Sequence, residues 1–126
     1  MSRIRPKRAT PRRRDSPQGD ADWWAWANPL LLTRCRGRCD RCGEVLHAME
    51  RHHRQRRQVG GDRLSNLLAL HPWCHTYITE HPTEAMANGW IVSSHAPDPA
   101  TVPVRLSVGG GLLWLLDDKG GRRLVP

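Results

Sequence analysis

The order and spacing of cysteine and histidine residues within residues 39–75 limit the fold of this chain more than any other feature. The segment contains Cys39-x-x-Cys42, His52-His53, Asn66 and His71-x-x-Cys74-His75. Zinc takes four thiolate or imidazole ligands in tetrahedral geometry, and a two-residue spacer lets both members of a pair reach one ion. The two spaced pairs therefore predict a structural zinc knuckle whose ligands are Cys39, Cys42, His71 and Cys74.

The remaining cysteine, Cys35, leaves an alternative open. It precedes Cys39 by four residues and would complete the zinc site if His71 were not a ligand. We prefer the pair formed by Cys39 and Cys42, because its spacer is shorter and the following Gly43 accepts the positive φ of a knuckle turn. A redox Cys-x-x-Cys is expected beside a βαβ unit, and the sequence has no such pattern.

The composition explains why a metal would matter to this chain. Of its 126 residues only 38% are apolar, none is Phe, and there are 11 Gly and 10 Pro. A small domain of this kind buries little apolar surface on folding and often depends on a metal or on disulfides. A structural zinc contributes on the order of 10 kcal/mol or more to folding.

The net charge of +8 is concentrated in the N-terminal part of the chain. Residues 1–14 carry +7, residues 15–57 carry +2 and residues 58–126 carry −1. A basic region beside a metal site indicates a polyanionic partner, with nucleic acid as the first candidate, although a basic tail also serves solubility alone. No segment reaches the ~20 apolar residues of a membrane span and no signal-peptide core is present, so we expect a cytoplasmic protein with no membrane partner.

The pattern of apolar residues, Gly and Pro predicts short elements. We expect a disordered basic tail over residues 1–20, and a break or a helix start at Pro29 within the Trp-rich segment 21–34. We also expect a strand over residues 45–52, a loop over 55–63, an apolar run over 64–70, a helix over 72–80 that begins with Pro72, and a short helix over 83–88 ended by Gly89. Beyond the loop 96–103, residues 104–125 predict two or three short strands with Gly turns.

Histidines 52, 53 and 75, together with Asn66, have the chemistry for metal-assisted attack on a phosphodiester. In this order, and with the zinc pairs around them, they resemble the HNH endonucleases of the ββα-metal type, particularly the small zinc-braced enzymes common in bacteriophages. The resemblance covers residues 39–92 and rests on CDRCG, HHR, GGDRLSNLLAL, HPWCH and GWIV. It implies an α+β fold with a small ββα-metal core.

The resemblance also implies a role for each matching residue. His53 would be the general base, and His52 and His75 would hold one catalytic divalent cation. Asn66 would brace the loop that orients His53. The arginines of the HHRQRR stretch would neutralise DNA backbone phosphates; they are Arg54, Arg56 and Arg57.

Two positions depart from the family pattern. His71-Pro-Trp-Cys74 stands where relatives often have Cys-x-x-Cys, and histidine is a competent zinc ligand. Thr79 stands where many relatives have a third metal histidine, four residues after His75. Two protein ligands favour Mg²⁺ or Mn²⁺ as the catalytic ion, with Ni²⁺ and Zn²⁺ as alternatives.

We therefore expect a disordered tail over 1–20, a nuclease domain with its zinc knuckle over 21–95 and a C-terminal β-hairpin extension over 96–126. The expected function is divalent-metal-dependent hydrolysis of DNA, as nicking or double-strand cleavage, with phage DNA processing or packaging as its setting and terminase or other DNA-processing proteins as partners. The alternatives are a non-catalytic zinc module that binds nucleic acid and an accessory subunit of a DNA-processing complex.

Overall fold

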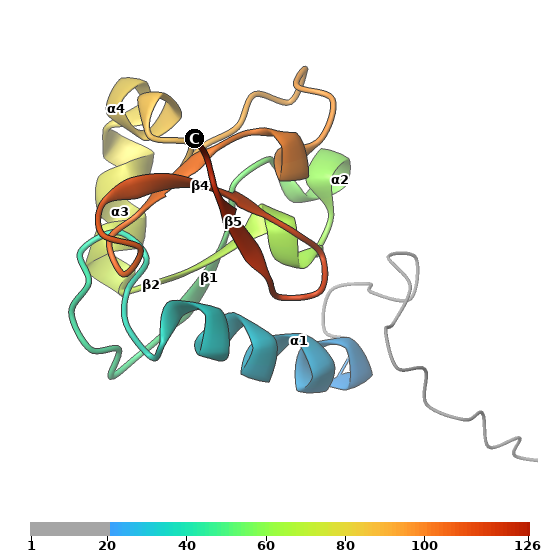
Figure 1. The fold of residues 1–126 in the computed structure, drawn as a ribbon, viewed down its shortest axis with the longest axis vertical. Helices are drawn as coiled ribbons and strands as arrows, with labels where there is room; N and C mark the ends of the chain where they lie inside the picture. The colour runs from blue at the N-terminus through green and yellow to red at the C-terminus, as the bar shows by residue number, and fades with distance from the viewer. Residues whose placement is uncertain (1–20) are drawn as a thin grey trace, which may run out of the picture.

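The computed structural model describes residues 21–126, and the tail expected over residues 1–20 lies outside this range. Residues 21–126 fold as α+β with two antiparallel sheets (Figure 1). The elements are, in order, α1 (Ala21–Cys35), β1 (Glu50–His53), α2 (Arg57–Gly60), η2 (Leu64–Asn66), β2 (Leu67–Leu70), α3 (Pro72–Glu80), α4 (Pro82–Ala87), η3 (Pro99–Thr101), β3 (Val104–Leu106), β4 (Leu112–Leu116) and β5 (Arg122–Leu124). Within the described range, no helix is both long and apolar enough to cross a membrane.

Strand β2 lies at the centre of the fold, and all four of its residues are buried. It pairs with β1 in an antiparallel hairpin in which His52 faces Leu68 and His53 faces Leu67. Because side chains alternate along a strand, β2 contributes to two cores. Leu67 and Ala69 pack with the buried side of α1, whereas Leu68 and Leu70 pack with α3 and the C-terminal sheet.

Helix α1 runs without interruption through Pro29, so the predicted break at that residue is wrong. Proline removes a hydrogen bond to the carbonyl four residues earlier, here that of Ala25. Both Pro29 and Ala25 are exposed, so water can satisfy that carbonyl. The opposite side of the helix is buried against β2 with a four-residue repeat at Trp23, Ala27, Leu31 and Cys35, which holds the helix together across the proline.

Most other predicted elements are present, with shifted boundaries. Helix α3 begins at Pro72 and ends at Glu80, as expected. The strand expected over residues 45–52 is shorter and begins at Glu50, since Val45 forms only an isolated bridge with Arg38. The loop expected over 55–63 contains one helical turn, α2.

The C-terminal segment forms the expected strands, and there are three of them. Strands β3, β4 and β5 make one antiparallel sheet in that order. Val104, Leu106 and Leu116 are buried from this sheet in the same core as Ile78 of α3. This segment therefore completes the core that Leu68 and Leu70 of β2 share with α3.

Candidate metal centre and catalytic cleft

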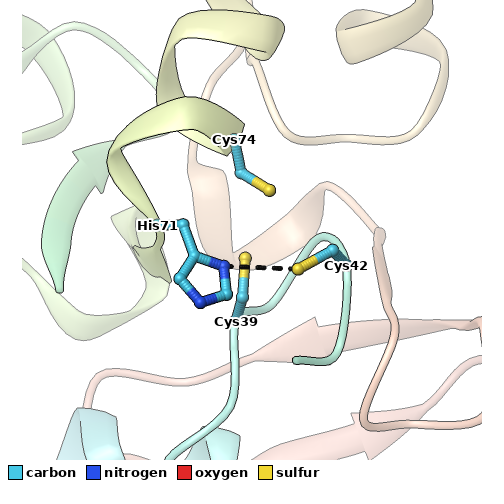
Figure 2. Close-up of side chains that lie close together, drawn as sticks. All are labelled: Cys39, Cys42, His71 and Cys74. Atoms are coloured by element: carbon cyan, nitrogen blue, oxygen red, sulfur yellow. Dashed lines mark hydrogen bonds between the residues drawn. The ribbon is translucent and has the colours of Figure 1, made fainter. Parts of the chain in front are cut away.

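The four predicted zinc ligands come together in one cluster. Cys39 and Cys42 lie on the loop after α1, His71 directly precedes α3 and Cys74 lies in its first turn, and all four side chains converge (Figure 2). One ligand atom from each residue lies within 4.8 Å of the others. Three thiols and one imidazole at this separation can hold a zinc ion.

The backbone shapes both sides of this cluster. Gly43 has φ 81°, the positive value expected for the knuckle turn, and its N–H donates to the Cys39 carbonyl at 2.9 Å. A Cβ at residue 43 would also meet the Ser107 hydroxyl oxygen at 2.5 Å, so a side chain there would displace that hydroxyl. On the other side, Pro72 starts α3, and this places His71 and Cys74 one turn apart.

The hydrogen bonds of His71 select the nitrogen that faces the cluster. Its Nε2 lies 3.0 Å from the Val45 carbonyl, which only accepts, so Nε2 carries the hydrogen. Nδ1 is left for the cluster and lies 3.3 Å from the Cys42 sulfur. A backbone partner that fixes the second ring nitrogen is typical of metal-binding histidines. The alternative ligand Cys35 lies outside the cluster, buried in the α1 core.

Electrostatics in the cluster favour a bound cation. Burial tends to raise the pKa of Cys39, but hydrogen bonds from the backbone N–H groups of Cys42, His71 and Arg41 outweigh it and lower the pKa. Burial, with the neighbouring thiols, raises the pKa of Cys74 to about 12. Three thiols this close ionise together only if positive charge compensates them. Arg41 supplies part of that charge through a hydrogen bond to the Cys74 sulfur at 3.4 Å.

A second group of histidines lies at the start of α3 and on β1. The rings of His52 and His75 meet edge to face with their centroids 5.0 Å apart. His52 is buried, and its Nε2 donates to the Trp90 carbonyl at 2.7 Å. His75 is partly exposed, and its Nδ1 lies 2.8 Å from Glu50 Oε1. One nitrogen of each ring is thus occupied, which leaves His52 Nδ1 and His75 Nε2 for a cation.

Burial lowers the pKa of His52 to about 4, although its hydrogen bond to Trp90 acts in the opposite direction. This histidine is therefore neutral at pH 7, and only a neutral imidazole binds a metal. The His52 imidazole thus has suitable chemistry to bind a divalent ion.

His53 is held by the buried carboxylate of Asp62, a residue for which the sequence predicted no chemical role. Its Nε2 lies 2.7 Å from Asp62 Oδ1, and Arg57 binds the same carboxylate through Nε at 2.9 Å and Nη2 at 3.1 Å. A carboxylate paired with arginine only accepts, so Nε2 of His53 carries the hydrogen and Nδ1 has the free lone pair. The side chain of His53 is 25% exposed, whereas that of Asp62 is 1% exposed.

Asn66 joins the two ends of the loop that carries Asp62. Its side-chain amide accepts from the Gln55 N–H at 2.7 Å and donates to the carbonyls of Gln55 at 2.8 Å and Gly61 at 2.9 Å. Gly60 allows this contact, because a Cβ there would lie 2.5 Å from the amide nitrogen. The fully buried Asn66 thereby fixes the loop that brings Asp62 to His53.

Arg54 does not have the predicted role at DNA phosphates. It is 1% exposed, and its guanidinium donates to four backbone carbonyls, those of Ser65, Gly89, Pro99 and Val102. It therefore links β1 to three other segments of the fold. Of the other two arginines in this prediction, Arg56 is exposed and Arg57 is the partner of Asp62.

A cleft of about 840 Å³ joins the histidines to α1. Its lining includes His53 and His75, with Glu50 and Arg51 from β1 and Arg57 from α2. Trp24 and Asn28 of α1, with Met49, complete the lining. Glu50 and Arg51 were not predicted as site residues. The sequence signal for them is the two-residue spacing that puts Glu50 on the same face of β1 as His52, and Arg51 on the same face as His53.

No protein-family model, curated protein or solved structure matches this chain.

Proposed function

We propose that this chain is a divalent-metal-dependent endonuclease of the HNH type that hydrolyses DNA phosphodiester bonds. The observation that carries the proposal is the convergence of His53 and His75 on one cleft, with His52 in ring contact with His75. The order β1, β2, α3, with the Cys₃His cluster at the start of α3, supports the ββα-metal interpretation. We propose that this cluster holds a structural zinc ion.

In this proposal His53 acts as the general base. The Asp62 carboxylate holds the proton on Nε2, so Nδ1 accepts a proton from the attacking water in the cleft. Asp62 also stabilises the imidazolium that forms, while Arg57 keeps the carboxylate ionised.

His52 and His75 would hold the catalytic cation, Mg²⁺ or Mn²⁺. When bound, such an ion offsets the charge of the scissile phosphate and stabilises the leaving 3′ oxygen. Glu50 fixes the orientation of His75 from the same face of β1 as His52. Thr79, at the position of the third histidine of many relatives, instead donates its hydroxyl to the His75 carbonyl at 3.1 Å.

The test is the metal dependence of DNA cleavage by the zinc-loaded protein. Supercoiled plasmid is incubated with added Mg²⁺, with added Mn²⁺ or with neither ion. In the last sample no chelator is used to remove the catalytic ion, because a chelator would also remove the structural zinc. We expect nicked or linear DNA with 5′ phosphate and 3′ hydroxyl ends only when the ion is added. DNA binding without cleavage under every metal condition would instead favour a non-catalytic nucleic-acid-binding module or a partner-dependent subunit.

A further inference from the structure

Part of the cleft lining comes from α1, which lies outside the segment that resembles HNH enzymes. Trp24 and Asn28 are four residues apart, so they lie on one side of the helix. Both line the cleft, and both contact Arg51 of β1. Helix α1 therefore has a role in this cleft besides its buried contact with β2.

Arg51 is fixed on two sides by these residues. Its guanidinium carbon lies 3.7 Å from the centre of the Trp24 ring, and its Nη1 donates to Asn28 Oδ1 at 3.1 Å. Stacking on an aromatic face and one directed hydrogen bond restrict a side chain that otherwise loses about 2 kcal/mol of rotamer entropy when it binds. The guanidinium is thus preorganised to donate hydrogen bonds to the oxygens of an anionic ligand.

Arg51 has no ion-pair partner among residues 21–126, although the nearby Asp62 carboxylate attracts its charge. Both contacts of Arg51 are to uncharged side chains. Arg57, the other arginine of the cleft, shares the Asp62 carboxylate with His53. An arginine without an ion-pair partner in a partly enclosed cleft attracts an anion strongly.

We propose that Trp24, Asn28 and Arg51 form a phosphate-binding subsite for a DNA strand in the cleft. Arg51 binds a phosphate next to the one presented to His53, and Trp24 and Asn28 position its guanidinium. Arg51 and His53 lie two residues apart on β1, about 7 Å along an extended strand. This is similar to the distance between successive phosphates of a nucleic-acid strand. The identity of the ligand rests on the proposed function.

The experiment measures DNA binding by the full-length, zinc-loaded protein in a His53→Ala background without added Mg²⁺ or Mn²⁺, conditions under which the proposed function allows no cleavage. Fluorescence anisotropy with a short labelled duplex gives the affinity over a range of salt concentrations. We expect Arg51→Gln to weaken binding about tenfold and to reduce the slope of log K against log salt by about 0.9, the value for one lost phosphate contact. We expect Trp24→Leu, which keeps every charge, to weaken binding severalfold.

Arg123→Gln is the matched control. Arg123 is exposed on β5, so this substitution removes the same charge outside the cleft. We expect its affinity and slope to match those of the parent. Arg51→Lys should restore the salt slope but only part of the affinity, because lysine keeps the charge and loses the planar stack. A purely structural role for Arg51 would lower thermal stability in Arg51→Gln and leave the slope unchanged.

Three results would overturn the subsite. They are an unchanged salt slope in Arg51→Gln, an equal loss of slope in Arg123→Gln, and absence of duplex binding by the His53→Ala parent. Cleavage by the chain with the native His53 tests the nuclease proposal separately. If the native protein cuts DNA but Arg51→Gln leaves the salt slope unchanged, the nuclease proposal stands and the subsite proposal fails. If Arg51→Gln reduces the slope but the native protein does not cut DNA, the subsite stands and the nuclease proposal fails.

Discussion

The proposed general base depends on a single buried acid for its orientation. Asp62 accepts from His53 Nε2, and an asparagine in its place can instead donate to that nitrogen. The proton of His53 would then move to Nδ1, where the attacking water needs a lone pair. We expect Asp62→Asn to lower the rate of plasmid cleavage about 100-fold, within the usual range for a general base.

This expectation requires that the variant keeps its structure. Zinc content and the near-ultraviolet circular dichroism spectrum should match those of the wild type. A correctly folded Asp62→Asn variant that cuts at the wild-type rate would remove Asp62 from the proposed mechanism.

The buried His52 makes stability depend on pH. Its folded pKa of about 4 lies below the ordinary value of 6.5, so between these values the unfolded chain binds more protons than the folded one. The contribution of His52 to the free energy of unfolding is therefore complete above pH 6.5 and falls as the pH is lowered towards 4. At pH 5 the loss is about 2 kcal/mol relative to pH 7.5.

Urea titrations at pH 7.5 and pH 5 would measure this loss in wild type and in His52→Gln. The glutamine can still donate to the Trp90 carbonyl, and it does not titrate. Since acid also weakens the thiolate cluster in both proteins, the relevant quantity is the difference between their pH dependences. Equal losses in the two proteins would contradict the assignment of this pH dependence to His52.

At the scale of elements, the cluster of three cysteines and one histidine connects the loop after α1 to the start of α3. Cys39 is fully buried in it. We expect Cys39→Ser to bind no zinc and to lose cooperative unfolding, since a zinc contribution of about 10 kcal/mol is comparable with the whole stability of a small domain. Metal analysis and thermal denaturation would check both expectations.

Cys35→Ala is the matched control for this variant. Cys35 is equally buried but belongs to the α1 core, so its loss should leave one zinc per chain and lower stability by roughly 1–2 kcal/mol. A folded, zinc-free Cys39→Ser protein would show that the fold does not depend on this metal.

The sequence predicted those elements whose signals are local. Pro72 sets the first turn of α3, and glycines separate the C-terminal strands. The same local reasoning failed at Pro29, because packing of α1 against β2 outweighs the lost hydrogen bond on the exposed side. Helix α1 continues through Pro29 because of its tertiary contacts with β2, and such contacts cannot be read from a single sequence.

The residues of the candidate site also divide into those that a local sequence pattern predicts and those that depend on the folded structure. Paired spacing found the four residues of the Cys₃His cluster, and the ordered histidines led to the residues around the cleft. Asp62 was missed because it reaches His53 only after Asn66 has closed the loop between them. Arg54 was misassigned because a run of arginines predicts exposed charge, whereas this side chain turns inward to four carbonyls.

At the scale of the whole molecule, two small cores share β2, and α1 and α3 lie on opposite sides of it. The hairpin brings His52 and His53 to the region where α3 begins, and α1 closes the other side of the cleft. A chain with few apolar residues can keep this arrangement if the metal cluster adds to its stability. The Cys₃His cluster and the cleft that we propose to be catalytic are thus separate sites, and α3 contributes Cys74 to the first and His75 to the second.

The most direct test of the central claim compares plasmid cleavage by wild type, His53→Ala and His95→Ala at equal zinc content with added Mn²⁺. His95 is an exposed histidine outside the lining of the cleft, so its variant controls for the loss of an imidazole. The account predicts that wild type and His95→Ala cut at similar rates and that His53→Ala loses at least about 100-fold in rate. Cleavage by His53→Ala at the wild-type rate would contradict the assignment of the base and, with it, the proposed active site.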